Sequence, residues 1–168
     1  IILLAPVFAS LWIYLGRRKW EPSIPVKFAM GIIFAGLGFG ALILGAANVN
    51  EAGLVLGWWL VLAYLLHTMG ELCLSPVGLS AVTKLSVPRI VGLMMGTWFL
   101  ATAYSEFVAM QLSKIAAIDN AVGETVDTTL ALASYYELFS FLFAIGCGVG
   151  ILLLLISPIL KRHMHGIH

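Results

Sequence analysis

Four apolar runs, each long enough to cross a lipid bilayer, constrain the fold of this chain more than any other feature. They cover residues 26–47, 54–82, 90–115 and 130–160. A helix needs about 20 predominantly apolar residues to span the hydrocarbon core of a bilayer. Only 10% of the 168 residues are charged and 61% are hydrophobic, whereas a soluble domain carries about 25% charged residues. The sequence therefore predicts an all-α integral membrane protein, built as a transmembrane helix bundle.

The two ends of the chain differ from these runs. Residues 1–16 are apolar but too short to span comfortably, and no basic region precedes them as it would in a signal peptide. We interpret them as the end of a transmembrane helix, so we expect the chain to be a piece of a longer protein. Residues 161–168 are predicted to be a polar tail.

Basic residues lie mainly on one side of the predicted crossings, and they set the expected orientation. Lys114 falls on one side, whereas eight of the nine fall on the other, namely Arg17, Arg18, Lys19, Lys27, Lys84, Arg89, Lys161 and Arg162. The positive-inside rule makes that side cytoplasmic. We therefore predict a protein of the cytoplasmic membrane with a cytoplasmic C-terminus. The net charge of +1 excludes a nucleic acid as the partner.

Two glycine pairs predict close packing between helices. Gly36 and Gly40 lie four residues apart in the second segment, and Gly146 and Gly150 repeat this spacing in the last. Small residues let helix backbones approach closely in a membrane, where lipid supplies no hydrophobic driving force between helices.

Glu71 is the strongest candidate for a functional residue. It lies near the middle of the run 54–82, at the depth where an ionisable group is most costly. Ser75 follows one helical turn later on the same face, and Pro76 leaves the carbonyl of Leu72 without its donor and predicts a helix kink. A carboxylate, a hydroxyl and a free carbonyl are an arrangement that holds a cation or an ammonium group. A carboxyl group bonding a neighbouring helix is the structural alternative.

Three further ionisable residues lie inside the predicted spans. His67 precedes Glu71 by one turn and could relay protons or bind a metal with it, but the pair lacks a third ligand. A structural histidine is the favoured interpretation. Glu137 lies near the outer interface, where the cost of a charge is small. Glu106 is either a buried hydrogen-bonding group or the wall of an aqueous cavity, and both interpretations stay open.

Four stretches carry a resemblance to a known family. They are GELCLSPVGLS at 70–80, GLMMGTWFL at 92–100, APVFASLW at 5–12 and PSIPVKFAMG at 22–31. The chain resembles the proton-dependent oligopeptide transporter family of the major facilitator superfamily. By this likeness residues 1–16 are the end of helix 8, and the four runs are helices 9 to 12, part of the C-terminal half of such a transporter.

The resemblance implies a role for each matching residue. Glu71 is similar to the glutamate that binds the amino terminus of the peptide and takes part in proton coupling, and Ser75 to a serine that helps hold the same ammonium. Trp98 resembles a wall of the side-chain pocket, and Leu79 a residue of the cytoplasmic gate. The implied partners are di- and tripeptides, protons, the bilayer and the N-terminal helices of the same transporter. No cofactor or metal is implied, because the proton gradient supplies the energy.

Two other functions are alternatives to a peptide symporter. A transporter of the same superfamily could carry nitrate, a drug or a sugar, although a carboxylate in the site favours a substrate amine. A membrane-embedded metalloenzyme using His67 and Glu71 lacks ligands. We therefore expect a transporter and not an enzyme.

Overall fold

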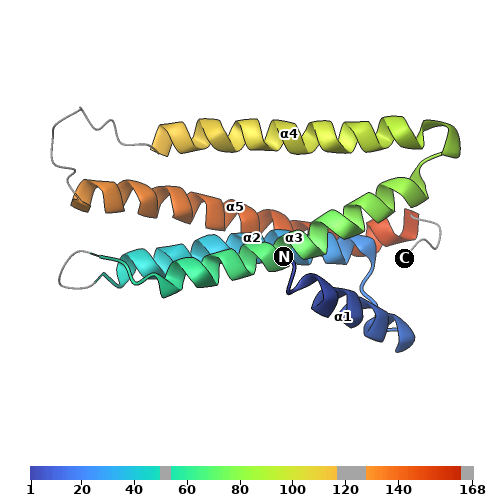
Figure 1. Cartoon of the computed structure of the whole chain (residues 1–168), viewed down its shortest axis with the longest axis horizontal. Helices are drawn as coiled ribbons and strands as arrows, with labels where there is room; N and C mark the ends of the chain where they lie inside the picture. Colours follow the sequence, from blue (N-terminus) through green and yellow to red (C-terminus); the bar gives the residue numbers. More distant parts are fainter. Residues whose placement is uncertain (50–53, 117–127, 164–168) are drawn as a thin grey trace.

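The computed structural model describes residues 1–49, 54–116 and 128–163, and these are largely helical (Figure 1). Four long helices run roughly lengthwise, α1 is a short helix set at an angle to them, and α4 lies apart from the others along most of its length. The elements are α1 (Ala5–Arg17), α2 (Ile24–Ala47), α3 (Trp58–Leu85), the 3-10 turn η1 (Pro88–Ile90), α4 (Val91–Ala116) and α5 (Thr128–His163).

Helix α2 is the centre of the bundle and packs against both α3 and α5. On the α5 side, the predicted glycine pairs meet each other. A Cβ atom built on Gly36 would lie 2.9 Å from the backbone nitrogen of Cys147, and one on Gly146 would lie 2.9 Å from Cα of Gly36. Gly40 lies against Phe143, and Gly150 against Ile33. The predicted packing role of these glycines is confirmed, because backbone meets backbone where the helices cross.

A second glycine face of α2, which the sequence analysis missed, contacts α3. Gly31, Gly38 and Gly45 recur every seven residues, close to two helical turns, so they share one face. A Cβ on Gly31 would lie 2.9 Å from the carbonyl oxygen of Gly70, and one on Gly45 would lie 2.8 Å from Cβ of Trp59. Only glycine allows α3 to lie this close along the whole of α2.

Helix α1 contacts α3 through a small apolar cluster and α2 through the ring of Trp12, and the linker after α1 forms an ion pair with α2. Phe8 packs with Leu72 and Cys73 of α3. Lys27, at the start of α2, is buried, and its Nζ lies 2.5 Å from Oε1 of Glu21 and 4.8 Å from the centre of the Trp12 ring. The buried charge is therefore paired, as a buried lysine requires.

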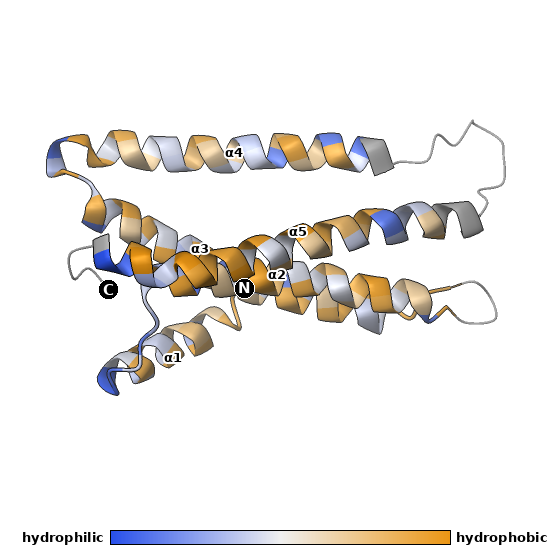
Figure 2. Ribbon diagram, turned by 180° about the vertical axis from the view of Figure 1, so that it is seen from behind, coloured by the Kyte–Doolittle hydropathy of each residue, from blue (hydrophilic) through white to orange (hydrophobic). Residues whose placement is uncertain are grey.

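Three helices in the described part of the chain are long and apolar enough to cross a membrane, namely α2, α3 and α5 over Leu132–Arg162. α4, with 26 residues, has sufficient length but is not apolar enough to be one of them. The helix in the predicted run 54–82 begins later, at Trp58, because Val55 first forms an antiparallel bridge with Val49. The end of α1, the α3–α4 turn and the end of α5 lie at the same end of the molecule, and each is hydrophilic (Figure 2).

Candidate functional site

Glu71 lies near the middle of α3, on a turn that is held firmly on one side. Gly70 is buried against Gly31 of α2, and a Cβ on Gly70 would lie 2.7 Å from the carbonyl oxygen of Gly31. The next residues, Leu72 and Cys73, are buried in the cluster with α1. Glu71 itself is exposed, and it forms no hydrogen bond or ion pair with the residues that the structure describes. Its carboxylate is therefore available to a ligand.

Ser75 follows on the same face of α3 and is half-buried. Within the described ranges, its hydroxyl has no hydrogen-bond partner either. Pro76, the next residue, is exposed inside the helix, so the carbonyl of Leu72 receives no backbone N–H. Beyond this region α3 inclines away from the bundle toward α4 (Figure 1). Among the described residues, the Glu71 carboxylate and the Ser75 hydroxyl thus have no hydrogen-bond partner, and the Leu72 carbonyl lacks the N–H that residue 76 would supply.

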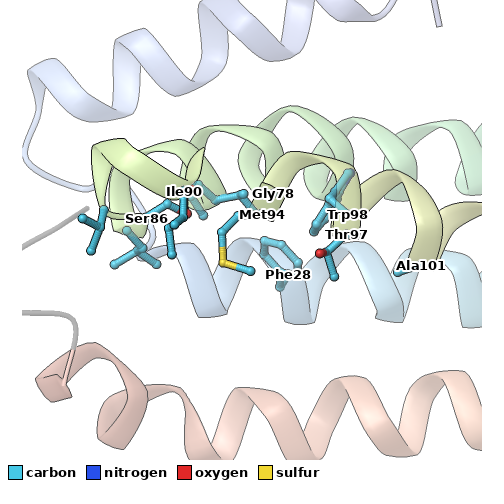
Figure 3. Close-up of a pocket in the computed structure, with 12 residues that line it drawn as sticks. Phe28, Gly78, Ser86, Ile90, Met94, Thr97, Trp98 and Ala101 are labelled. Atoms are coloured by element: carbon cyan, nitrogen blue, oxygen red, sulfur yellow. Dashed lines mark hydrogen bonds between the residues drawn. The ribbon is translucent and has the colours of Figure 1, made fainter. Parts of the chain in front are cut away.

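Trp98 reaches α3 from α4 and lies close to this region. Its ring fits over Gly78, one turn beyond Ser75, and any Cβ atom at Gly78 would overlap the ring. The ring also meets Phe28 of α2 edge to face, with centroids 6.5 Å apart (Figure 3). Trp98 is the side chain that joins α4 to both α2 and α3. The structure therefore brings Trp98 to the helix that carries Glu71 and Ser75.

A cavity of about 550 Å³ opens beside Trp98, between α3 and α4, and runs toward the turn that joins them (Figure 3). Its walls are almost entirely apolar. The two hydroxyl groups among the lining residues, those of Ser86 and Thr97, donate to carbonyls of their own helices, at Val82 and Leu93. The cavity offers space and apolar contact but few hydrogen bonds. Sequence reasoning missed it, because spacing within one helix does not predict how α3 and α4 sit against each other or that Phe28 of α2 closes one side.

The other candidates occupy distinct places. Leu79 is half-buried on α3, one turn beyond Ser75. His67 lies against α2, where its ring nitrogen Nε2 is 3.0 Å from the carbonyl oxygen of Ala35. Glu106 and Glu137 are exposed on α4 and α5. Among the described residues, no three His, Cys, Asp or Glu side chains come close enough to hold a metal ion.

Known proteins match this chain over most of its length. The sequence model of the POT family matches residues 1–129. The chain is 41% identical to the uncharacterized transporter YclF of Bacillus subtilis (strain 168), over 99% of the chain and 30% of that protein. It is 35% identical to dipeptide and tripeptide permease A of Edwardsiella piscicida, over 96% of the chain and 32% of the permease. The chain thus spans about a third of the length of the curated relatives it matches.

The fold is also that of solved transporters. A crystal structure of a mutant of the peptide transporter POT, in complex with alafosfalin, superposes with a TM-score of 0.78 at 38% identity. The match covers 96% of this chain and 30% of that one. The predicted all-α fold of an integral membrane protein, part of a major facilitator transporter, is confirmed. The chain belongs to the POT family, the proton-dependent oligopeptide transporter family that its sequence resembles.

Proposed function

We propose that this chain supplies the C-terminal-bundle wall of the substrate site in a proton-coupled symporter of di- and tripeptides. The observation that carries the proposal is the Glu71 carboxylate at the middle of α3, with the Ser75 hydroxyl one turn away, neither of which has a partner in the part of the chain that the structure describes. An intramembrane carboxylate is costly and marks a substrate or ion pathway. The similarity to a dipeptide and tripeptide permease supports a peptide as the substrate.

In this proposal each residue has a stated role. Glu71 and Ser75 bind the ammonium group of the peptide, and Trp98 forms the wall of the pocket that receives a side chain. Leu79 belongs to the cytoplasmic gate. The kink at Pro76 frees the Leu72 carbonyl and lets the part of α3 beyond Pro76 move. The N-terminal helices of the same transporter complete the site, because such sites form between two halves near the midplane.

Proton coupling follows from the chemistry of one carboxyl group. Glu71 binds either a proton or, as a carboxylate, the substrate ammonium, so loading and release of the peptide are linked to protonation. The proton gradient drives the cycle, and no cofactor takes part.

The orientation of the chain in the cytoplasmic membrane is part of the proposal. The ends of α1 and α5 and the α3–α4 turn lie at one end of the molecule (Figure 2), and they carry Arg17, Lys84 and Arg162 with their basic neighbours. The positive-inside rule makes this end, with the C-terminus, cytoplasmic.

Transport of another cargo by the same fold is the second candidate. Nitrate would gain nothing from a carboxylate in the site, and a sugar or an uncharged drug offers no ammonium group to it. Competition by dipeptides against uptake separates these cargoes from peptides.

The test is uptake of a labelled dipeptide by the complete transporter in liposomes, with and without an inward proton gradient. We expect accumulation that depends on the gradient. Glu71→Gln removes the group that exchanges proton and ammonium, so it should abolish gradient-driven accumulation. Glu137→Gln, an exposed glutamate on α5, is the matched control and should accumulate peptide normally. Unimpaired accumulation by Glu71→Gln would remove the coupling role, and no accumulation by the folded unmodified protein would exclude peptide as the cargo.

A further inference from the structure

His67, one helical turn before Glu71, makes a hydrogen bond that joins α3 to α2. Its Nε2 atom lies 3.0 Å from the carbonyl oxygen of Ala35 on α2. A carbonyl oxygen only accepts, so Nε2 carries the hydrogen and donates it. The imidazole is half-buried, so water competes less for its hydrogen bond, and the bond contributes more to holding the two helices together.

The surface of α2 is shaped to receive this imidazole. A Cβ atom at Gly38 would overlap the ring of His67 and lie 2.5 Å from Nε2, so only glycine admits the side chain. The neighbouring Phe39 meets the ring edge to face, with centroids 4.8 Å apart. Phe39 in turn stacks on Phe139 of α5 at 6.2 Å. The imidazole thus ends a row of rings that connects three helices.

This contact lies next to the backbone of Glu71. His67 precedes Glu71 by four residues, and Gly70, which meets Gly31, precedes it by one. Leu74, three residues later, also packs on Gly31. The turn that carries Glu71 is therefore attached to α2 on both sides of the carboxylate, while the carboxylate itself stays exposed.

The backbone of α3 needs this lateral support. Pro76 removes one hydrogen bond from the helix a little more than one turn beyond Glu71, and α3 inclines away from the bundle below that point (Figure 1). The half of α3 that ends at Glu71 is held against α2 by His67 and Gly70. Beyond Pro76, Val77 and Ala81 pack on Ile24 of α2, and Gly78 receives the ring of Trp98 from α4.

We propose that His67 is a positioning residue of the substrate site. Its hydrogen bond to Ala35 holds the Glu71 turn against α2, so that the carboxylate stays at the depth and in the direction at which it meets the substrate ammonium. This inference rests on the proposed function of Glu71. It assigns no proton transfer and no metal to His67.

Three variants separate the hydrogen bond from simple packing. His67→Phe keeps a ring against Phe39 but has no donor, and His67→Gln keeps an N–H donor of similar reach. His67→Leu removes both, and it serves as the second donor-free variant if the phenylalanine variant does not accumulate in the membrane. Affinity is measured with purified complete transporter, for labelled dialanine and for N-acetyl-dialanine, which lacks the ammonium group.

We expect His67→Phe to weaken dialanine binding by about tenfold, a coupling of the size usual for residues in one hydrogen-bonded network. Binding of N-acetyl-dialanine should be unchanged, because that ligand makes no ion pair with Glu71. His67→Gln should retain most of the dialanine affinity. A purely structural histidine would instead weaken both ligands equally or weaken neither.

A double-variant cycle with Glu71→Gln gives the deciding result. If His67 acts through Glu71, then His67→Phe causes no further loss of dialanine affinity in the Glu71→Gln background. If the losses of dialanine affinity from His67→Phe and Glu71→Gln instead multiply in the double variant, the inference is overturned. An unchanged dialanine affinity in both His67→Phe and His67→Leu overturns it as well. Failure of the unmodified transporter to bind or accumulate dialanine is a different outcome, which rejects the proposed function and with it this role of His67.

Discussion

Helices α2 and α4 are similar in length, 24 and 26 residues, yet they are held in opposite ways. α2 has a neighbour on two sides, and glycines form both contacts: Gly36 and Gly40 face α5, and Gly31, Gly38 and Gly45 face α3. Close approach of backbones favours helix association in lipid because it increases van der Waals packing. The position of α2 is therefore determined by shape, within this chain alone.

Helix α4 has no such surface. None of its described side chains is fully buried, and Leu100 is 70% exposed. Its glycines, Gly92 and Gly96, have nothing within 4 Å of a built Cβ. Contact with α2 and α3 is made near one end, through Trp98 and the turn to α3, and α4 touches α5 at few positions. A helix held in this way takes its position from whatever lies beside it, and not from glycine contacts within this chain.

The largest effect should come from the crossing of α2 and α5. Gly146→Leu places a side chain where a Cβ alone would lie 2.9 Å from Cα of Gly36, and backbone cannot yield. Overpacking of this kind costs about 3 kcal/mol or more. We expect a strong loss of thermal stability of the complete transporter in detergent.

Gly148→Leu is the matched control for that variant, because it lies on the same helix and has open space around its Cβ. It should unfold within a few degrees of the unmodified protein. Equal losses of thermal stability in the two variants would show that the contact between α5 and α2 is no more sensitive than the rest of α5. The contrast between a tightly packed α2 and a loosely held α4 would then be wrong.

The ion pair between the start of α2 and the linker from α1 should have the next largest effect. Glu21→Gln leaves the buried ammonium of Lys27 without its carboxylate. Loss of one partner of a buried pair costs about 3–5 kcal/mol, but the side chain of Glu21 is 37% exposed, so we expect a smaller cost of about 1–3 kcal/mol because water screens it. Adding Lys27→Met should recover most of the stability. A double variant less stable than the single one would contradict this account.

The sequence predicted the parts of the fold that depend on one segment at a time. Apolar runs predict helices because lipid leaves the backbone no other partner, and the four-residue spacing of Gly36 and Gly40 predicts a contact face. The seven-residue spacing of Gly31, Gly38 and Gly45 carried the same kind of signal and was overlooked.

The parts of the site that several helices form together could not be predicted from the sequence. Trp98 lies on Gly78, and His67 bonds Ala35, because of which helices meet and at what level. The same holds for the lack of partners for Glu71 and Ser75 among the described residues. Spacing along one helix predicts that Ser75 follows Glu71 on one face, but it says nothing about the register of α4 against α3. The roles of these residues stay predictions that uptake and binding will test.

A smaller effect is expected where α4 meets α3. Gly78→Ala adds a methyl group that overlaps the ring of Trp98. The obstacle here is a side chain on a weakly attached helix, so the ring or α4 shifts, and we expect a cost of about 1 kcal/mol, at the low end for overpacking. Trp98→Leu in the same background should relieve it, as measured by thermal unfolding. A loss as large as that of Gly146→Leu would mean that α4 is held as rigidly as α2.

The smallest effect should come from the hydroxyl groups of α4. The Oγ1 atom of Thr102 donates to the carbonyls of Trp98 and Phe99, at 2.9 and 3.0 Å, within its own helix. These carbonyls belong to the backbone ladder of the helix, so Thr102→Val removes a bond that the fold does not need and keeps the shape of the side chain. We expect the free energy of unfolding to change by less than about 0.5 kcal/mol, as for substitutions away from packed or networked groups. A loss above about 1 kcal/mol, the usual size of one hydrogen bond, would show that Thr102 bonds a neighbouring helix in the complete transporter. The exposed face of α4 would then be as closely covered there as the glycine faces of α2.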